Sequence, residues 1–142
     1  MLDELVRVSV ELRLEKAREC LKDAETMLVA GSYAACANRS YYSIFHAMQA
    51  VLVTVGFSSK KHSGCISEFR KRFVKTGIFS EIHSDIIGDA FNVRTKSDYD
   101  VHYVIAKADV EKQVENAKIF IEAVESYIIG IIAKDKRTKV DV

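Results

Sequence analysis

The sequence contains no proline and no tryptophan, and only six glycines interrupt its 142 residues. Proline and glycine most often break helices, so their scarcity favours long helices joined by few turns. The three cysteines, Cys20, Cys36 and Cys65, are odd in number and show no paired spacing, which argues against a disulfide framework. No apolar run approaches the roughly 18 residues that a membrane-spanning helix needs.

Net charge is almost absent as well, at +1, so no global field favours nucleic acid. Residues 60–75 nevertheless carry six basic side chains and a single acid, Glu68. Such runs usually form solvated surface, and the alternative is a surface for RNA or a protein partner. The first residues lack the basic start and apolar run of a signal peptide. Together with the unpaired cysteines, this predicts a cytoplasmic protein without membrane attachment.

Apolar residues recur every three or four positions through most of the chain, which is typical of amphipathic helices. The pattern predicts helices from about residue 14 to residue 30, over 33–55, over 63–77, from 80 to the nineties, and over 109–133. Ser32, Ser63, Ser80 and Asp109 are the expected N-terminal caps. Residues before 14 either extend the first helix or form a short separate one.

We therefore expect an all-α fold, an up-and-down antiparallel bundle of four to five helices over residues 1–133. A polar, basic tail is expected over residues 134–142, where the last helix frays. In the fourth helix the apolar spacing turns four side chains toward the core: Ile82, Ile86, Ala90 and Val93.

The first of two segments rich in arginine, tyrosine and histidine is residues 38–46, with the sequence Asn-Arg-Ser-Tyr-Tyr-Ser-Ile-Phe-His. Arg39, Tyr42 and His46 recur at helical spacing beside the apolar stripe. Because buried polar groups are normally paired, this line predicts a hydrogen-bond network between helices or a dimer seam. The alternative is a line of nucleotide contacts, since arginine binds phosphate through a planar fork of donors.

The second segment is residues 92–103, with the sequence Asn-Val-Arg-Thr-Lys-Ser-Asp-Tyr-Asp-Val-His-Tyr. Serine and aspartate favour turns and caps, so the fourth helix is expected to loosen or end near Ser97. Arg94 and Asp98 are four positions apart and can form an ion pair. One interpretation is a structural corner, in which this pair simply ties helix ends together.

The other interpretation of the second segment is metal-free RNA cleavage. Arg94 would bind the phosphate, and His102 would transfer protons while the neighbouring 2′-hydroxyl attacks phosphorus. Asp98 would orient the arginine. Tyr99 or Tyr103, which follow the expected helix end, would stack on a base or be modified.

Metal and cofactor sites find little support in the sequence. None of the four histidines forms a Glu-x-x-His pair, and no glycine-rich phosphate loop is present. Asp98, Asp100 and His102 alternate, which suits a divalent cation only if the segment is extended. We therefore expect neither a metal nor a cofactor.

Together these segments resemble a known family. Residues 35–52 resemble the second helix of HEPN-domain proteins (higher eukaryotes and prokaryotes nucleotide-binding). The triplet His62-Ser63-Gly64 with Phe69, and then residues 94–99, resemble the same family in the same order. The resemblance covers about residues 14–130 and is greatest to the small stand-alone prokaryotic members.

The resemblance implies a helical bundle, commonly a homodimer, that is often paired with a small nucleotidyltransferase. Many members are metal-independent ribonucleases that act as toxins. The transferase is then the antitoxin, and in some pairs it adds AMP to a tyrosine near the active site. The leading expectation is therefore a toxin-like endoribonuclease that acts on RNA through Arg94 and His102. The alternative is a non-catalytic nucleotide-binding or adaptor subunit that docks a nucleotidyltransferase.

The family's catalytic signature is an arginine followed, after four to six residues, by a histidine. Seven residues separate Arg94 from His102. Aligning Tyr99 with the modified tyrosine of the family instead places Lys96 at the histidine position and Phe91 at the arginine position. Arg39 and His46 match the spacing, but they lie on a different helix from the family's active site.

Overall fold

The computed structural model describes residues 2–140, with side chains described for residues 2–136. Across these residues the chain forms five α-helices and one π-helical turn, and it contains no strand. The all-α prediction is therefore confirmed. The elements are α1 (Glu4–Val29), α2 (Tyr33–Val53), α3 (His62–Phe69), the π-turn η1 (Arg70–Val74), α4 (Glu81–Tyr99) and α5 (Lys107–Val140).

Local signals set several of the helix ends. The Asp3 carboxylate accepts a hydrogen bond of 2.8 Å from the Val6 N–H, which satisfies a donor at the start of α1. At the end of α1, Gly31 has a φ of 76°, a left-handed conformation that glycine adopts without strain. The Ser32 N–H then returns to the Met27 carbonyl at 2.9 Å, closing a Schellman motif. This tight turn reverses the chain and sets α2 antiparallel to α1.

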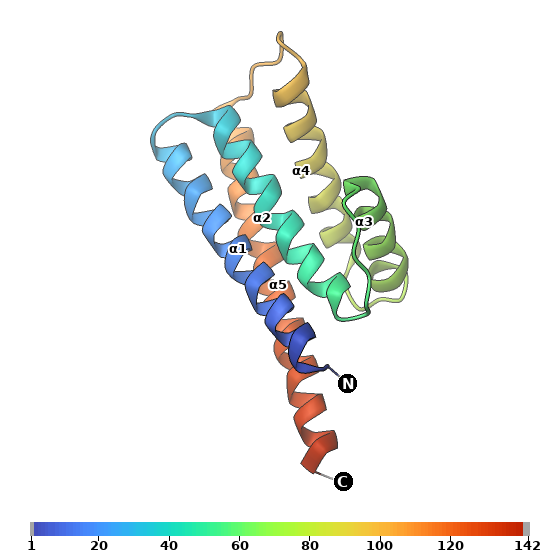
Figure 1. Cartoon of the computed structure of the whole chain (residues 1–142). Coiled ribbons are helices and arrows are strands. Elements are labelled where there is room, and N and C mark those ends of the chain that lie inside the picture. The colour runs from blue at the N-terminus through green and yellow to red at the C-terminus, as the bar shows by residue number, and fades with distance from the viewer. Residues whose placement is uncertain (1, 141–142) are drawn as a thin grey trace.

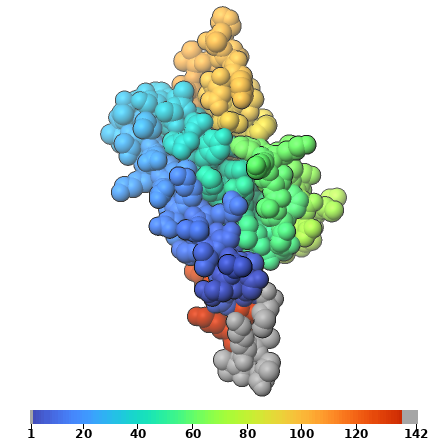
Figure 2. Space-filling view, in the orientation of Figure 1, coloured from blue at the N-terminus to red at the C-terminus, as the bar shows by residue number. Residues whose placement is uncertain are grey.

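The long helices α1, α2, α4 and α5 alternate in direction, as expected for an up-and-down bundle, whereas the short α3 runs in the same direction as α2 (Figure 1). Helices α1, α2 and α5 form a long bundle. Helix α4 lies against α2 on one side, and α3 with η1 packs beside the first half of α4 (Figure 1). The loop between α4 and α5 projects from one end of the molecule, while both chain ends lie at the other (Figures 1 and 2).

A cluster of aromatic rings joins the short helices to the long ones. The Phe69 ring stacks on Phe73 at 5.6 Å between centroids, and it lies 5.2 Å from Phe79 and 5.8 Å from Phe120 of α5. All four rings are buried. Burying a phenylalanine side chain contributes about 1.5–3 kcal/mol, so this cluster fixes α3 and η1 onto the bundle.

The structure corrects several predicted ends. Helix α3 begins at His62 with Lys61 at the N-cap, so Ser63 lies in its first turn. Helix α5 begins at Lys107, which puts Asp109 in the first turn instead of at the cap. Ser32 and Ser80 do occupy the N-cap positions predicted for them.

The first and last helices also run further than the pattern predicted. Helix α1 starts at Glu4, so the residues before 14 extend it and form no separate helix. Helix α5 continues to Val140, past the expected fray after Ala133, and buries Asp135 against Arg7 with an ion pair of 2.6 Å. Part of the segment expected as a tail is thus helical, and residues 141–142 lie outside the described residues.

One predicted core residue of α4 faces solvent. The Ile82 side chain is 63% exposed, whereas Ile86 and Ala90 are buried as expected. The inward place in the first turn is taken by His83, whose ring packs edge-on against Phe79 and Phe120. None of the described helices combines the length and the hydrophobicity that crossing a membrane requires.

We expect Phe69→Ala to lower the free energy of unfolding by about 3–5 kcal/mol, because it leaves a cavity among three other rings. Urea denaturation followed by circular dichroism measures this loss. Ile129→Ala, which truncates an exposed side chain on α5, is the control and should change the free energy by less than about 0.5 kcal/mol. A similar, small effect of both substitutions would contradict the role given to the aromatic cluster.

Candidate functional site

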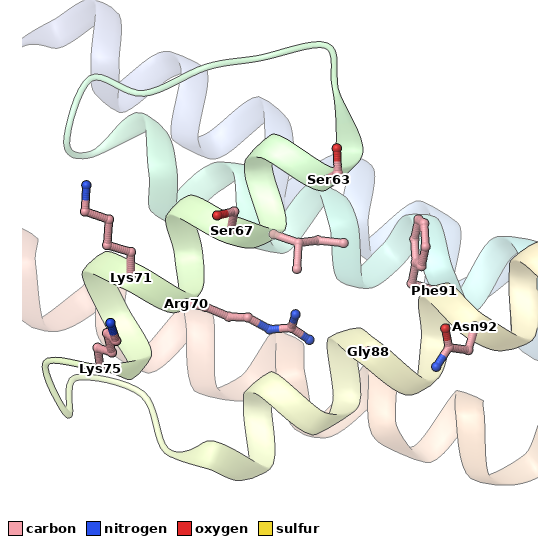
Figure 3. Close-up of a pocket in the computed structure, with 9 residues that line it drawn as sticks. Ser63, Ser67, Arg70, Lys71, Lys75, Gly88, Phe91 and Asn92 are labelled. Carbon is pink, nitrogen blue, oxygen red and sulfur yellow. The ribbon is translucent and has the colours of Figure 1, made fainter.

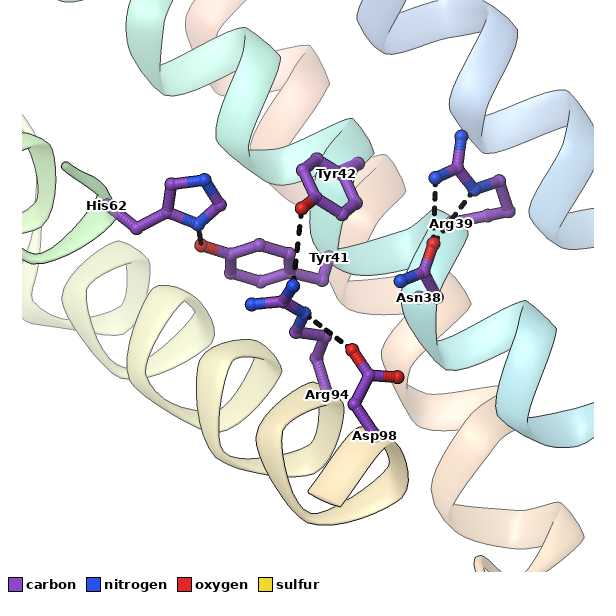
Figure 4. A network of polar contacts seen from close by, with 7 residues as sticks. All are labelled: Asn38, Arg39, Tyr41, Tyr42, His62, Arg94 and Asp98. Atoms are coloured by element: carbon purple, nitrogen blue, oxygen red, sulfur yellow. Dashed lines mark hydrogen bonds and ion pairs between the residues drawn. The ribbon is translucent and has the colours of Figure 1, made fainter. Parts of the chain in front are cut away.

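The Arg94 side chain extends from α4 to two adjacent tyrosines of α2 (Figure 4). Its Cζ lies 5.3 Å from the centroid of the Tyr41 ring and 5.5 Å from that of Tyr42. Its Nη2 donates to the Tyr42 hydroxyl at 3.3 Å. Only 18% of the Arg94 side chain is exposed, so the ring faces stabilise a cation that is largely removed from water.

Asp98 supplies the negative charge. Its Oδ2 lies 2.9 Å from Arg94 Nε, one helical turn along α4, and the pair expected from their spacing is therefore present. Because Asp98 and Tyr42 engage Nε and Nη2, the guanidinium has a fixed orientation and its Nη1 remains for another acceptor (Figure 4). A fixed arginine fork with a remaining donor can bind one oxygen of a phosphate.

His62 joins this network from the first turn of α3. Its Nδ1 lies 2.7 Å from the Tyr41 hydroxyl, and its ring stacks on Phe45 with centroids 4.1 Å apart (Figure 4). Burial, and then the positive charge of Arg94, lower the pKa of His62. Burial raises the pKa of Tyr41 even though Arg94 opposes it. Both groups are thus neutral at pH 7, and His62 can accept a proton.

Tyr42 connects the two segments that the sequence singled out. On one side it receives the hydrogen bond from Arg94, and on the other the Arg39 Cζ lies 5.3 Å from its ring centroid. Arg39 donates through Nε and Nη2 to the Asn38 side-chain oxygen, at 3.1 and 2.7 Å. His46 packs further along, with its ring 6.1 Å from Tyr42. The predicted line on α2 therefore lies beside Arg94 as part of one cluster.

His102 stands apart from this network. Helix α4 continues to Tyr99 without a break at Ser97, and His102 follows in an exposed loop. The polar contact recorded for His102 is made by its backbone N–H, which donates to Asp100 Oδ1 at 2.9 Å. From Arg94 to Tyr99 the continuous helix rises by about 7.5 Å, and the loop then projects beyond the bundle (Figure 2). No contact between the Arg94 and His102 side chains is recorded among the described residues.

The two candidate tyrosines differ in environment. Tyr99 ends α4 with 75% of its side chain exposed. Tyr103 is half-buried and packs against the smaller apolar cluster that includes Ile105 and Val110. Across the described residues no group of three or more histidine, cysteine, aspartate or glutamate side chains is placed to hold a metal ion.

Two members of the network, His62 and Tyr41, were not among the site residues predicted from the sequence. His62 stands in the His-Ser-Gly triplet that carries part of the family resemblance, and Tyr41 stands in the first segment. Their importance follows from packing, because Tyr41 and His62 are 21 positions apart in the sequence. The feature of the sequence that could have indicated His62 was the His-Ser-Gly triplet at the start of a predicted helix.

Comparison with known proteins decides the family. The HEPN domain matches residues 10–127, which is most of the chain. This chain belongs to the HEPN family. The family resemblance carried by residues 35–52 and 94–99 is thereby confirmed.

Relatives of similar length come from archaea and bacteria. A Methanocaldococcus jannaschii protein named "Putative toxin MJ0142" is 32% identical over 121 residues, covering 85% of this chain and 82% of that protein. A second protein of the same organism, "Putative toxin MJ0605", is 30% identical over 93% of this chain and 98% of its own length. A "UPF0332 protein" of Thermotoga maritima is 32% identical over 84% of this chain and 90% of its own length.

We expect acid to destabilise this HEPN domain through its half-buried histidines. Burial lowers the pKa of His46, assisted by the charges of Lys16 and Arg13, and burial also lowers the pKa of His62 and His83. The unfolded chain takes up protons near pH 6.5, before the folded chain does, so stability is full above that pH and falls below it.

Thermal unfolding at about pH 7.5 and pH 5.5, on either side of the histidine pKa, measures this loss. His46→Gln should make the decrease in melting temperature smaller, because it removes one group that resists protonation. His102→Gln changes an exposed side chain and should leave the decrease unaltered. An equal decrease in the wild type and His46→Gln would contradict the assignment.

Proposed function

We propose that this HEPN protein is a toxin-like, metal-independent endoribonuclease whose phosphate-binding group is Arg94. The observation that carries the proposal is the Arg94 guanidinium, fixed by Asp98 and Tyr42 beside a neutral histidine. Two relatives whose names call them toxins, at 32% and 30% identity, support the toxin role.

The reaction needs a base, an acid and a group that stabilises charge on phosphorus. A base removes the proton from the 2′-hydroxyl, whose oxygen bonds to the adjacent phosphorus while the bond to the 5′-oxygen breaks. An acid returns a proton to that leaving oxygen, and Arg94 stabilises the negative charge of the transition state. The products are a 2′,3′-cyclic phosphate and a 5′-hydroxyl.

Two histidines compete for the proton transfer. His102 is the candidate from the second segment, and its exposed loop leaves it accessible to RNA. The geometry favours His62, because Nδ1 is engaged by Tyr41 and the ring is thereby oriented with Nε2 for a substrate. Tyr99, exposed at the end of α4, would stack on a base. Arg39 and Tyr42 would bind the part of the strand that lies on the side of Arg94 away from His62 (Figure 4).

We also propose a homodimer that brings two such sites into one cleft. The dimer interface must then lie beside the site. The loop after α4 exposes the apolar side chains of Val101 and Val104, close in sequence to the exposed Tyr99. Exposed apolar side chains gathered in this way mark interaction surfaces. A small nucleotidyltransferase would act as the antitoxin, and the exposed Tyr99 hydroxyl is the proposed acceptor of AMP.

One observation favours the second candidate, a non-catalytic adaptor that docks a nucleotidyltransferase. The Arg94 charge already has a carboxylate and two tyrosine rings as partners. Such a network can serve to fix α4 against α2 without meeting RNA. Under this proposal Tyr99 and the loop after it form the docking surface, and no histidine is required.

We expect the purified protein to cleave single-stranded RNA in EDTA and Arg94→Ala to reduce the rate by at least about 100-fold, as removal of one charge-stabilising donor does elsewhere. His62→Ala and His102→Ala, assayed in parallel, identify the histidine that transfers the proton. Gel separation of end-labelled RNA measures the rate, and circular dichroism confirms that each variant folds.

His83→Gln is the control histidine, because it lies on the far half of α4 against Phe79. Cleavage lost in Arg94→Ala and in one histidine variant, and kept in His83→Gln, supports the ribonuclease. Absence of cleavage by the wild type, or cleavage that none of the variants alters, would overturn it and favour the adaptor.

For the dimer, we expect the double substitution Val101→Ser and Val104→Ser to convert a dimer to a monomer. Analytical ultracentrifugation measures the mass, since removing apolar area from an interface weakens association. Ile129→Ser changes an exposed apolar residue of α5 and should leave the dimer intact. A wild-type monomer, or a dimer insensitive to the double substitution, would contradict this interface.

A further inference from the structure

A second feature lies beside the Arg94 network, a pocket of about 690 Å³ between α3, η1 and the first half of α4 (Figure 3). None of the residues of the Arg94 network lines it. Ligand pockets in proteins typically span about 300–1,000 Å³, so this one is large enough for part of a nucleotide chain. Its lining includes Ser63, Arg70, Lys71, Lys75, Gly88 and Phe91.

The charges of the pocket are all of one sign. Arg70, Lys71 and Lys75 line it, and no carboxylate does. None of the three forms an ion pair with a carboxylate among residues 2–136. Arg72, in the same short stretch, differs because its Nε lies 2.6 Å from Glu68 Oε2. Three cations without a counter-charge make an anion the expected occupant.

The π-turn gathers these cations on one side. The Lys75 N–H bonds to the Arg70 carbonyl at 2.9 Å, five positions back. In an α-helix five residues rotate by about 500°, which would turn Lys75 some 140° away from Arg70. The π-turn instead closes nearly one turn over five residues, so Lys75 lies one turn beyond Arg70. Such turns are rare in proteins, and those that occur often lie at functional sites.

Arg70 is fixed in position across α4. Its Nε donates to Ser84 Oγ at 2.9 Å and its Nη2 to the Ser84 carbonyl at 3.4 Å. Gly88 leaves room for the guanidinium, because a Cβ built there would lie 3.1 Å from Arg70 Nη2 (Figure 3). A guanidinium held in this way loses little conformational entropy when it binds an anion.

The pocket adjoins the Arg94 network at two points. Ser63 of the pocket directly follows His62, and the Phe91 ring at the pocket wall lies 6.0 Å from the Tyr41 ring. Phe91 also offers an aromatic side chain on which a base can stack. A strand whose phosphate contacts Arg94 would therefore reach the cations of the pocket within a short length.

We propose that this basic pocket binds a phosphate of the RNA strand, next along the chain from the phosphate that Arg94 binds. Arg70 and Lys75 contact the phosphate oxygens, and Phe91 packs on the adjoining base. The RNA is taken from the proposed function, on which this inference rests. The basic residues of the 70–75 segment thereby have two roles, because Arg72 pairs with Glu68 while Arg70, Lys71 and Lys75 bind RNA.

Binding can be separated from cleavage with a fluorescent single-stranded RNA whose 2′-O-methyl sugars block the attacking hydroxyl. Fluorescence anisotropy at several salt concentrations gives the affinity and its salt dependence. We expect Lys75→Gln to weaken binding several-fold and to lower the salt slope by about 0.7, the loss of one phosphate contact on a single strand. Arg72→Gln removes the same charge outside the pocket and should leave the slope unchanged.

Gly88→Ala tests the pocket without changing the charge. The added methyl group crowds the Arg70 guanidinium, so RNA affinity should fall several-fold. Gly130→Ala, in α5, meets no atom within 4 Å and should bind as the wild type does. Alanine is the better helix former at both positions, so loss of folding would not explain a difference between them.

Each outcome decides the proposal. Weakening by Lys75→Gln and Gly88→Ala, with both controls unchanged, supports the pocket even if the protein cleaves no RNA. Equal RNA affinity in all variants overturns the pocket even if the protein is a ribonuclease. Calorimetry tests AMP and inorganic phosphate in the same way. If Lys75→Gln and Gly88→Ala weaken the binding of these small anions but leave RNA affinity unchanged, the pocket binds a small anion and its role for RNA is overturned. A wild type that binds no RNA overturns it too.

Discussion

The register between α2 and α4 depends on where the Arg94 guanidinium finds its partners. A cation with most of its side chain out of water must meet a carboxylate, ring faces or hydrogen-bond acceptors. Tyr41 and Tyr42 supply the ring faces from α2, and Asp98 supplies the charge one turn along α4. Sliding α4 by one turn would separate Arg94 from both tyrosines while Asp98 moved with it, so the tyrosines fix the position of the helix. His62 follows, because its partner is Tyr41.

The parts of this structure that the sequence predicted are those fixed by neighbouring residues. Helical spacing marked α2 and α4, and Ser32 and Ser80 marked the starts of these two helices. The Arg94–Asp98 pair belongs to the same class, since positions four apart meet on any α-helix. The two polar segments were identified from their residues and also carry the family resemblance, and the fold places them side by side through Tyr42.

The parts that the sequence did not predict depend on packing between distant segments. His62 reaches Tyr41, and through it the Arg94 network, only because the Phe69 cluster docks α3 onto the bundle. The helix passes Ser97 because tertiary contacts and the Asp98 pair outweigh the turn preference of serine and aspartate. That same continuity leaves His102 in the exposed loop. The basic pocket likewise requires Gly88 of α4 to lie opposite Arg70. These residues are too far apart in the sequence for a local pattern to predict that contact.

The π-turn over Arg70–Val74 also bears on how relatives of different length can share this bundle. One π-turn is equivalent to an α-helix that has accommodated a single inserted residue. Deleting one residue there would restore α-helical bonding with little rotation of the following chain relative to Phe69, because the π-turn has absorbed the extra residue. Phe73 and Phe79 would therefore keep their places in the aromatic cluster. A shorter homologue is therefore expected to align with this chain across a gap at this turn, and to carry a different set of side chains on the wall of the pocket.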